Sequence, residues 1–125
     1  IQMKDMKPLT EREEEVMNIF WENGPLSVRD VVALHDEPRP SRTTVATFVK
    51  FLEQKCYLDH KVESSGFIYF PIIGREDYCG HNLKSVIRRY FDNSIHNVVN
   101  FLIKNDGCSD IEAKELISQI FDKGK

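Results

Sequence analysis

The stretch Ser41–Cys56, with the sequence SRTTVATFVKFLEQKC, is the most informative part of this chain. Its apolar residues recur at the i, i+3, i+4, i+7 spacing that buries one side of a helix, and they are Val45, Phe48, Val49 and Leu52. About half a turn away lies a small, hydroxylated and basic set, formed by Arg42, Thr43, Ala46, Thr47 and Lys50. Ser41 is the expected N-cap. A helix that packs on one side and presents short polar groups on the other can lie in the major groove of DNA.

Two shorter helices are predicted ahead of this stretch, each opened by a capping box. The first box is Thr10 with Glu13, and the second is Ser27 with Asp30. The first helix should end at the Asn-Gly-Pro turn of residues 23–25. The residues expected to be buried by these two helices are Val16, Ile19, Phe20, Val28, Val31, Val32 and Leu34.

Two short runs rich in aromatic and β-branched residues follow the central helix, at residues 57–62 and 67–72. The turn between them contains Ser64, Ser65 and Gly66, and glycine is free to take a positive φ. A strand, a turn and a second strand directly after such a helix indicate the wing of a winged helix-turn-helix. Because the turn carries no large side chain, its backbone amides and serine hydroxyls could reach a DNA phosphate.

The pattern becomes helical again beyond Gly74, with helices expected at residues 77–91 and 94–104 and a last one opened by Ser109 and Glu112. Three helices in about 50 residues cannot bury so much apolar surface alone. A two-fold dimer in which both copies share one core is the economical solution. The residues expected in that interface are Tyr90, Phe91, Ile95, Val98, Val99, Leu102, Leu116, Ile120 and Phe121.

The predicted fold is therefore mainly α-helical with a small β-hairpin wing. Residues 1–73 are expected to form a winged-helix DNA-binding domain, and residues 74–125 a helical dimerisation domain. The net charge of −3 does not suggest a nucleic-acid binder. Basic residues nevertheless outnumber acidic ones between Arg39 and Lys61, whereas acids crowd into residues 11–15. A weakly acidic protein can bind DNA if its basic groups face one way.

The expected DNA contacts are of two kinds, to base edges and to phosphates. Threonines can meet base edges, with their methyl groups against thymine, whereas basic side chains and the wing serines suit phosphates. Thr44 falls between the two faces of its helix, and the alternative for it is a bond to a backbone carbonyl only. The full expected set is Arg39, Arg42, Thr43, Thr44, Thr47, Lys50, Lys61, Ser64 and Ser65.

Several other classes of protein are not expected from this sequence. No apolar run approaches the roughly 18 to 20 residues that cross a membrane, and no signal peptide is recognisable. The cysteines, Cys56, Cys79 and Cys108, are far apart and odd in number, which is typical of a reducing cytoplasm. Neither they nor the histidines have metal-ligand spacing, so no metal or cofactor is expected. No nucleophile elbow, glycine-rich loop or carboxylate pair indicates an enzyme.

Several segments together carry a family resemblance. They are Leu9-Thr-Glu-Arg-Glu13, Val16-Met-Asn-Ile-Phe-Trp21, Thr43-Thr-Val45 with Thr47, residues 52–61, Tyr69-Phe-Pro71 and Val98-Val-Asn-Phe-Leu-Ile-Lys104. In their order and spacing the chain resembles the BlaI/MecI group of penicillinase and methicillin-resistance repressors, which includes copper-responsive relatives. The resemblance covers nearly the whole chain.

This resemblance implies a homodimer that binds a palindromic double-stranded operator through its winged helices and represses an antibiotic-resistance operon. It also implies release when a membrane-bound sensor triggers proteolysis, at a bond that here matches Asn100-Phe101. The chain departs from the pattern at Thr43 and Ala46, where some relatives carry basic residues, so a different operator sequence is expected. It has no Cys-x-Cys motif, so copper sensing is not expected.

Two other functions stay open. The first is a winged helix that docks protein partners without touching DNA, which the acidic first helix favours. DNA binding instead requires Arg42, Lys50, Lys61 and the wing to lie on one continuous surface. The second is a repressor controlled by a small ligand, which would need an apolar pocket.

Overall fold

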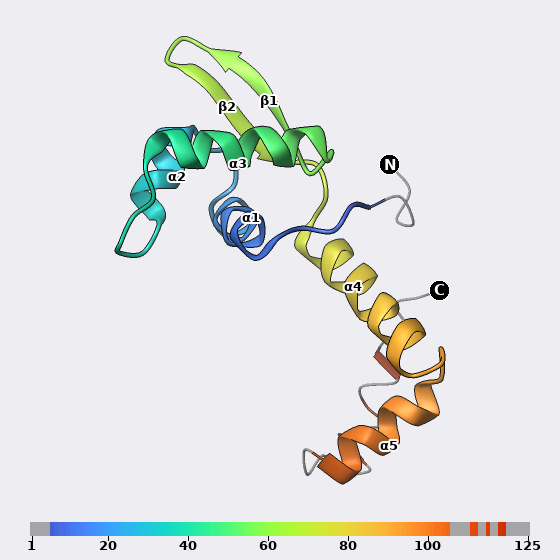
Figure 1. Ribbon diagram of the computed structural model, residues 1–125. Helices are drawn as coiled ribbons and strands as arrows, with labels where there is room; N and C mark the ends of the chain where they lie inside the picture. The colour runs from blue at the N-terminus through green and yellow to red at the C-terminus, as the bar shows by residue number, and fades with distance from the viewer. Residues whose placement is uncertain (1–5, 106–110, 113–114, 116–117, 120–125) are drawn as a thin grey trace. The chain divides into compact units, whose positions relative to one another are not determined.

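The computed structural model describes residues 6–105, 111–112, 115 and 118–119 (Figure 1). The described helices and strands are α1 (Glu11–Asn23), α2 (Val28–Leu34), α3 (Arg42–Gln54), β1 (Leu58–Glu63), β2 (Gly66–Pro71), α4 (Arg75–Tyr90) and α5 (Ile95–Asn105). The strands form one antiparallel hairpin. The predicted fold class, mainly α with a hairpin wing, is confirmed. Within the described part of the chain, no helix is long and apolar enough to cross a membrane.

The chain forms two compact units, Ile1–His81 and Asn82–Lys125. The first unit therefore extends into α4, beyond the 73/74 boundary expected between the functional domains. The reason is Tyr78, which is buried and packs its ring edge-to-face on Tyr57, with 5.8 Å between ring centroids. The division into a DNA-binding and a dimerisation domain stays a prediction.

The helix starts of the first unit follow their capping residues. Thr10 accepts the Glu13 backbone N–H at 3.2 Å, and the Glu13 carboxylate accepts the Thr10 N–H at 2.8 Å. Ser27 and Asp30 make the same reciprocal pair, with both distances 3.2 Å. Ser41 caps α3 by accepting the N–H of Thr44 at 3.1 Å. Both capping boxes and the α3 cap are confirmed, because these bonds satisfy backbone donors that a helix start leaves free.

The core of the first unit lies where α1, α2, α3 and the hairpin meet. Val45, Val49 and Leu52 of α3 are fully buried and Phe48 is partly buried, which confirms the predicted stripe. The α1 residues Val16, Met17 and Phe20 pack in the same cluster. One expectation was wrong: Leu34 is 46% exposed. It is the last residue of a short helix and lines an open groove rather than the core.

The hairpin pairs Leu58 with Pro71 at its base and Glu63 with Gly66 at its turn. Gly66 has φ +122°, which is the positive φ expected at this position. The structure adds a contact that the strand pattern did not show. Leu26, between α1 and α2, exchanges two backbone hydrogen bonds with Tyr69 of β2, at 2.9 and 2.8 Å. These bonds tie the hairpin to the helices at mid-strand.

The described part of the second unit has little core of its own. Ile87 is its buried apolar side chain, and Phe91 packs edge-to-face on Phe101 with 5.6 Å between ring centroids. The large apolar side chains that stay exposed include Leu83, Val86, Tyr90 and Phe101. Of the residues expected in the dimer interface, Leu116, Ile120 and Phe121 lie outside the described residues, as do Ser109 and Cys108.

Candidate nucleic-acid interface

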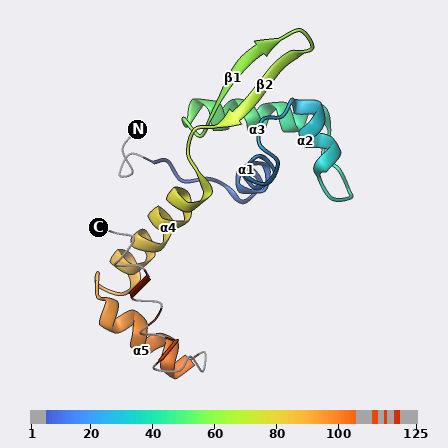
Figure 2. The ribbon, with the colours of Figure 1, turned by 180° about the vertical axis from the view of Figure 1, so that it is seen from behind.

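The outer face of α3 is polar and open to solvent. Its exposed residues are Arg42, Thr43, Thr44, Ala46, Thr47 and Lys50. Figures 1 and 2 show the hairpin projecting on one side of α3 and α1 lying on the other. The helix is therefore held along its apolar stripe, and its threonine-rich side remains free for an external partner.

The threonine hydroxyls of α3 differ in their local bonds. Thr47 donates to the carbonyl of Thr43 at 3.0 Å, which is the kind of backbone bond expected as the alternative for Thr44. Thr44 instead accepts the Ser41 hydroxyl at 2.9 Å. Thr47 still offers lone pairs and a methyl group to a base edge, whereas Thr44 belongs to the cap of the helix.

The basic residues expected at this face fall into two groups. Arg42 and Lys50 make no ion pair with any residue that the structure describes, so both positive charges are available to an external partner. Arg39 pairs with Glu37 at 3.4 Å, and Lys61 pairs with Glu63 at 3.3 Å. All four of these paired side chains are about half exposed or more. Exposed pairs contribute only about 0–1 kcal/mol, so a phosphate could replace either carboxylate.

A groove of about 440 Å³ connects the start of α3 with the wing. Arg42 lines it from α3, and Ser65 and Gly66 line it from the hairpin turn. Arg29 of α2 lines it as well, and sequence reasoning missed this residue. The only indication in the sequence was a basic residue two positions after the Ser27 cap. The fold therefore brings two guanidinium groups and a wing hydroxyl to one concave surface, together with the Asp30 carboxylate of the α2 capping box.

The other predicted contacts lie outside this groove. Lys50 is eight residues after Arg42 on the same helix, so it lies about 12 Å further along the axis. Lys61 is on β1, paired in register with Ile68 of β2, and Ser64 is exposed at the hairpin turn. Arg39 is in the turn between α2 and α3, where its Nε donates to the carbonyl of His35 at 3.3 Å. Arg42 and the wing thus share one groove, and Lys50 is on the exposed side of the same helix.

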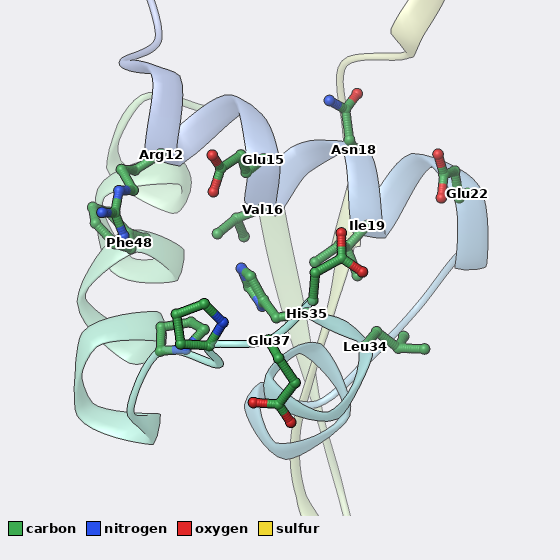
Figure 3. A pocket seen from close by; sticks show the side chains of 13 residues that line it. Arg12, Glu15, Val16, Asn18, Ile19, Glu22, Leu34, His35, Glu37 and Phe48 are labelled. Atoms are coloured by element: carbon green, nitrogen blue, oxygen red, sulfur yellow. The ribbon is translucent and has the colours of Figure 1, made fainter.

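Acidic residues gather around a different groove, of about 620 Å³, between α1 and the α2–α3 turn (Figure 3). Figure 3 shows Glu15 and Glu22 projecting from α1 and Glu37 from the turn. Asp36 also lines this groove, and Arg12 is its one Lys or Arg side chain. The two grooves share no lining residue. Most of the acidic side chains that line the two grooves thus belong to this second groove, whereas Asp30 is the one carboxylate that lines the groove of Arg29 and Arg42.

Comparisons with known proteins identify a family and several relatives that this chain resembles. Residues 9–122 match the penicillinase repressor family. The chain is 28% identical to the penicillinase repressor of Bacillus licheniformis over 124 residues, covering 98% of this chain and 96% of that protein. It is 24% identical to the methicillin resistance regulatory protein MecI of Mammaliicoccus sciuri over 109 residues, covering 86% and 89% of the two chains.

Two solved structures of the repressor BlaI are also similar to this chain. The solution structure of the DNA-binding domain of the repressor BlaI superposes with a TM-score of 0.52 and 27% identity, covering 58% of this chain and 90% of that one. The monomeric form of Bacillus licheniformis BlaI in complex with the blaP half-operator gives a TM-score of 0.50 at the same identity and coverage. Because the family match spans most of its length, this chain belongs to the penicillinase repressor family.

Proposed function

We propose that this protein is a transcriptional repressor that inserts α3 into the major groove of operator DNA. The observation that carries the proposal is the exposed threonine face of α3, with a groove running from Arg42 to the wing. Beside this face lie Arg42 and Lys50, which form no ion pair within the described part of the chain. In this arrangement Thr43 and Thr47 meet base edges. The matched BlaI structure with a half-operator supports this reading for a related fold.

The basic residues and the wing would hold the DNA backbone. Arg29, Arg42 and Ser65 line one groove, so one phosphate could be bound from two helices and the hairpin turn. Lys50 would contact a second phosphate along the major groove. Arg39 and Lys61 would exchange their exposed carboxylate partners for phosphates, and losing each of these ion pairs would cost only about 0–1 kcal/mol.

Dimerisation through the second unit would complete the operator complex. Leu83, Val86 and Tyr90 of α4 are exposed, and no residue of α5 is fully buried. A second copy would cover this apolar surface. Two α3 helices related by a two-fold axis would then enter successive major grooves about 34 Å apart, on a near-palindromic operator.

Release would follow a cut at the Asn100-Phe101 bond. This bond lies inside α5, and the Phe101 ring packs on Phe91. A cut here divides the helix that carries Val98, Val99 and Leu102, so the shared core would be lost. Each remaining half-site contact would then form separately, and operator affinity would fall. Because the bond is helical, α5 must open locally before a protease can act on it.

The test is a gel shift of the purified protein on the DNA upstream of its own gene, across a salt series. We expect saturable binding, two chains per site, that outcompetes random DNA and weakens steeply with salt. Equal affinity for upstream and random DNA would contradict operator recognition.

A second candidate function is docking of a protein partner in the acidic groove between α1 and the α2–α3 turn. The exposed apolar side chain of Leu34 within an acidic border is the feature that favours it. This alternative predicts that Arg42→Ala leaves function intact, whereas DNA binding predicts a loss. The groove does not offer a small ligand the enclosed apolar pocket that ligand-controlled repression would need.

A further inference from the structure

Three metal-ligating side chains converge where α3 meets the wing. Glu53 is in the last turn of α3, and Asp59 and His60 lie at the start of β1. One carboxylate oxygen from each acid and one ring nitrogen of His60 all lie within 4.8 Å of one another. The residues come from two elements joined by a turn, so their spacing resembles no linear metal motif.

Ring contacts and a carboxylate contact hold the His60 side chain within this cluster. The centroid of its ring is 4.7 Å from that of Phe67 and 5.4 Å from that of Tyr69, both on β2. Its Nδ1 contacts the Glu53 carboxylate directly. Asp59 uses one oxygen to accept the backbone N–H of His60 at 2.8 Å, which orients the other. A metal ion would therefore meet donors that are already gathered at one place.

The charge of the cluster favours a cation. Among the residues that the structure describes, no Lys or Arg forms an ion pair with Glu53 or Asp59, and the neighbouring Lys61 pairs with Glu63. The side chains of Glu53 and His60 are 32% and 33% exposed, and Asp59 is exposed. An ion can thus enter from solvent, and water can complete its coordination.

We propose that Glu53, Asp59 and His60 bind one divalent transition-metal ion, with Zn²⁺ matching the mixed nitrogen and oxygen donors. Two ligands bonded to one zinc at about 2.0–2.2 Å are at most about 4.4 Å apart. All three donor atoms lie within 4.8 Å of one another, but His60 Nδ1 and the Glu53 carboxylate are in direct contact, so these two side chains must rotate apart to admit the ion. The ion would occupy the position between His60 Nδ1 and Glu53, in place of their direct contact.

A bound ion would join the C-terminal turn of α3 to β1 and so fix the wing against the recognition helix. Because the site forms only in the folded chain, binding would also stabilise the native state. Any effect on operator affinity rests on the proposed DNA-binding function, whereas metal binding itself does not.

The test is calorimetric titration of the metal-stripped full chain with Zn²⁺. Glu53→Gln, Asp59→Asn and His60→Phe should each abolish binding at concentrations that saturate the parent protein. His60→Phe keeps an aromatic ring beside Phe67, and circular dichroism without metal checks each fold. Two matched controls, Glu63→Gln on the same strand and Cys56→Ser in the adjoining turn, should bind as the parent does.

Absence of binding by the parent protein, retention by any of the three variants, or loss in Cys56→Ser would overturn the proposal. A second measurement needs no variant. Substoichiometric Mn²⁺ should broaden the amide NMR signals of residues 53, 59 and 60 before any others. Broadening centred elsewhere would place the metal at a different site and contradict the assignment.

Discussion

The two units of this protein differ in how they bury apolar side chains. In the first unit, Phe20, Val45 and Leu52 are fully buried within one cluster formed by three helices and a hairpin. In the described part of the second unit, Ile87 is buried while Tyr90 is 71% exposed. The first unit thus has a core formed within one chain, whereas the described part of the second unit leaves large apolar side chains exposed. A difference in stability should follow from this difference in packing.

The largest expected effect compares two phenylalanines. Phe20→Ala removes a fully buried ring and should lower the free energy of unfolding of the first unit by about 3–5 kcal/mol. Phe101 is 46% exposed, so Phe101→Ala should lower the free energy of unfolding of the monomer far less. Trp21, the one tryptophan, reports unfolding of the first unit by fluorescence during urea titration, and far-UV circular dichroism follows the helices of both units. Equal losses for the two variants would contradict the contrast between the units.

Introducing a negative charge into the second unit should separate the two copies of the expected dimer. Leu102→Asp places a carboxylate in the expected interface, and the protein should then sediment as a monomer. Losing the linked second half-site should weaken operator binding about 100-fold. His96→Asp adds the same charge at an exposed position of α5 and should leave the dimer intact. A Leu102→Asp protein that remained dimeric would show that the interface lies elsewhere.

Removing one charge from the outer face of α3 should have a smaller effect. Lys50→Ala should weaken binding to operator and random DNA alike, because a phosphate contact carries no sequence information. The log-log salt slope should fall by about 0.9. Lys104→Ala, on the second unit, is the matched control and should change neither quantity. A loss confined to the operator would assign Lys50 to a base instead.

The smallest expected effect is pH-dependent and confined to the first unit. Glu13 is buried and accepts Lys55 Nζ at 2.7 Å. Burial alone would raise the pKa of Glu13, but the bonds from Lys55 and Thr10 outweigh it and lower this pKa overall. Because the folded pKa lies below the unfolded value, the stabilisation is present above the unfolded pKa and lost as pH falls.

Glu13→Gln should therefore flatten the acid limb of the stability curve of the first unit, measured by urea denaturation followed through Trp21. Glu11→Gln, at an exposed position in the same helical turn, is the control and should retain the parent curve. An unchanged acid limb in Glu13→Gln would mean that this ion pair does not contribute to the pH dependence.

Local patterns predicted much of the first unit. The capping residues set the starts of α1, α2 and α3, and helical periodicity identified Val45, Val49 and Leu52 as buried. Such features depend on residues within one or two turns of one another. The same reasoning overestimated the burial of Leu34, because periodicity gives the direction of a side chain and not whether another element covers it.

Contacts between distant segments could not be predicted in this way. The bridge of Leu26 to Tyr69 uses backbone groups, which carry no sequence pattern. Arg29 joins Arg42 only because α2 and α3 pack beside the wing. Likewise, Glu53 meets His60 because a turn folds β1 back against α3. In each case the residues gain their role from tertiary packing rather than from spacing.

The most direct test of operator binding through α3 is an amide NMR titration of the protein with its upstream DNA. We predict that the largest shifts fall on residues 42–50, on Ser64 and Ser65, and on Arg29. Residues of the acidic groove, such as Glu15 and Glu37, should change little. Shifts concentrated in that groove, with α3 unaffected, would contradict DNA recognition by this helix.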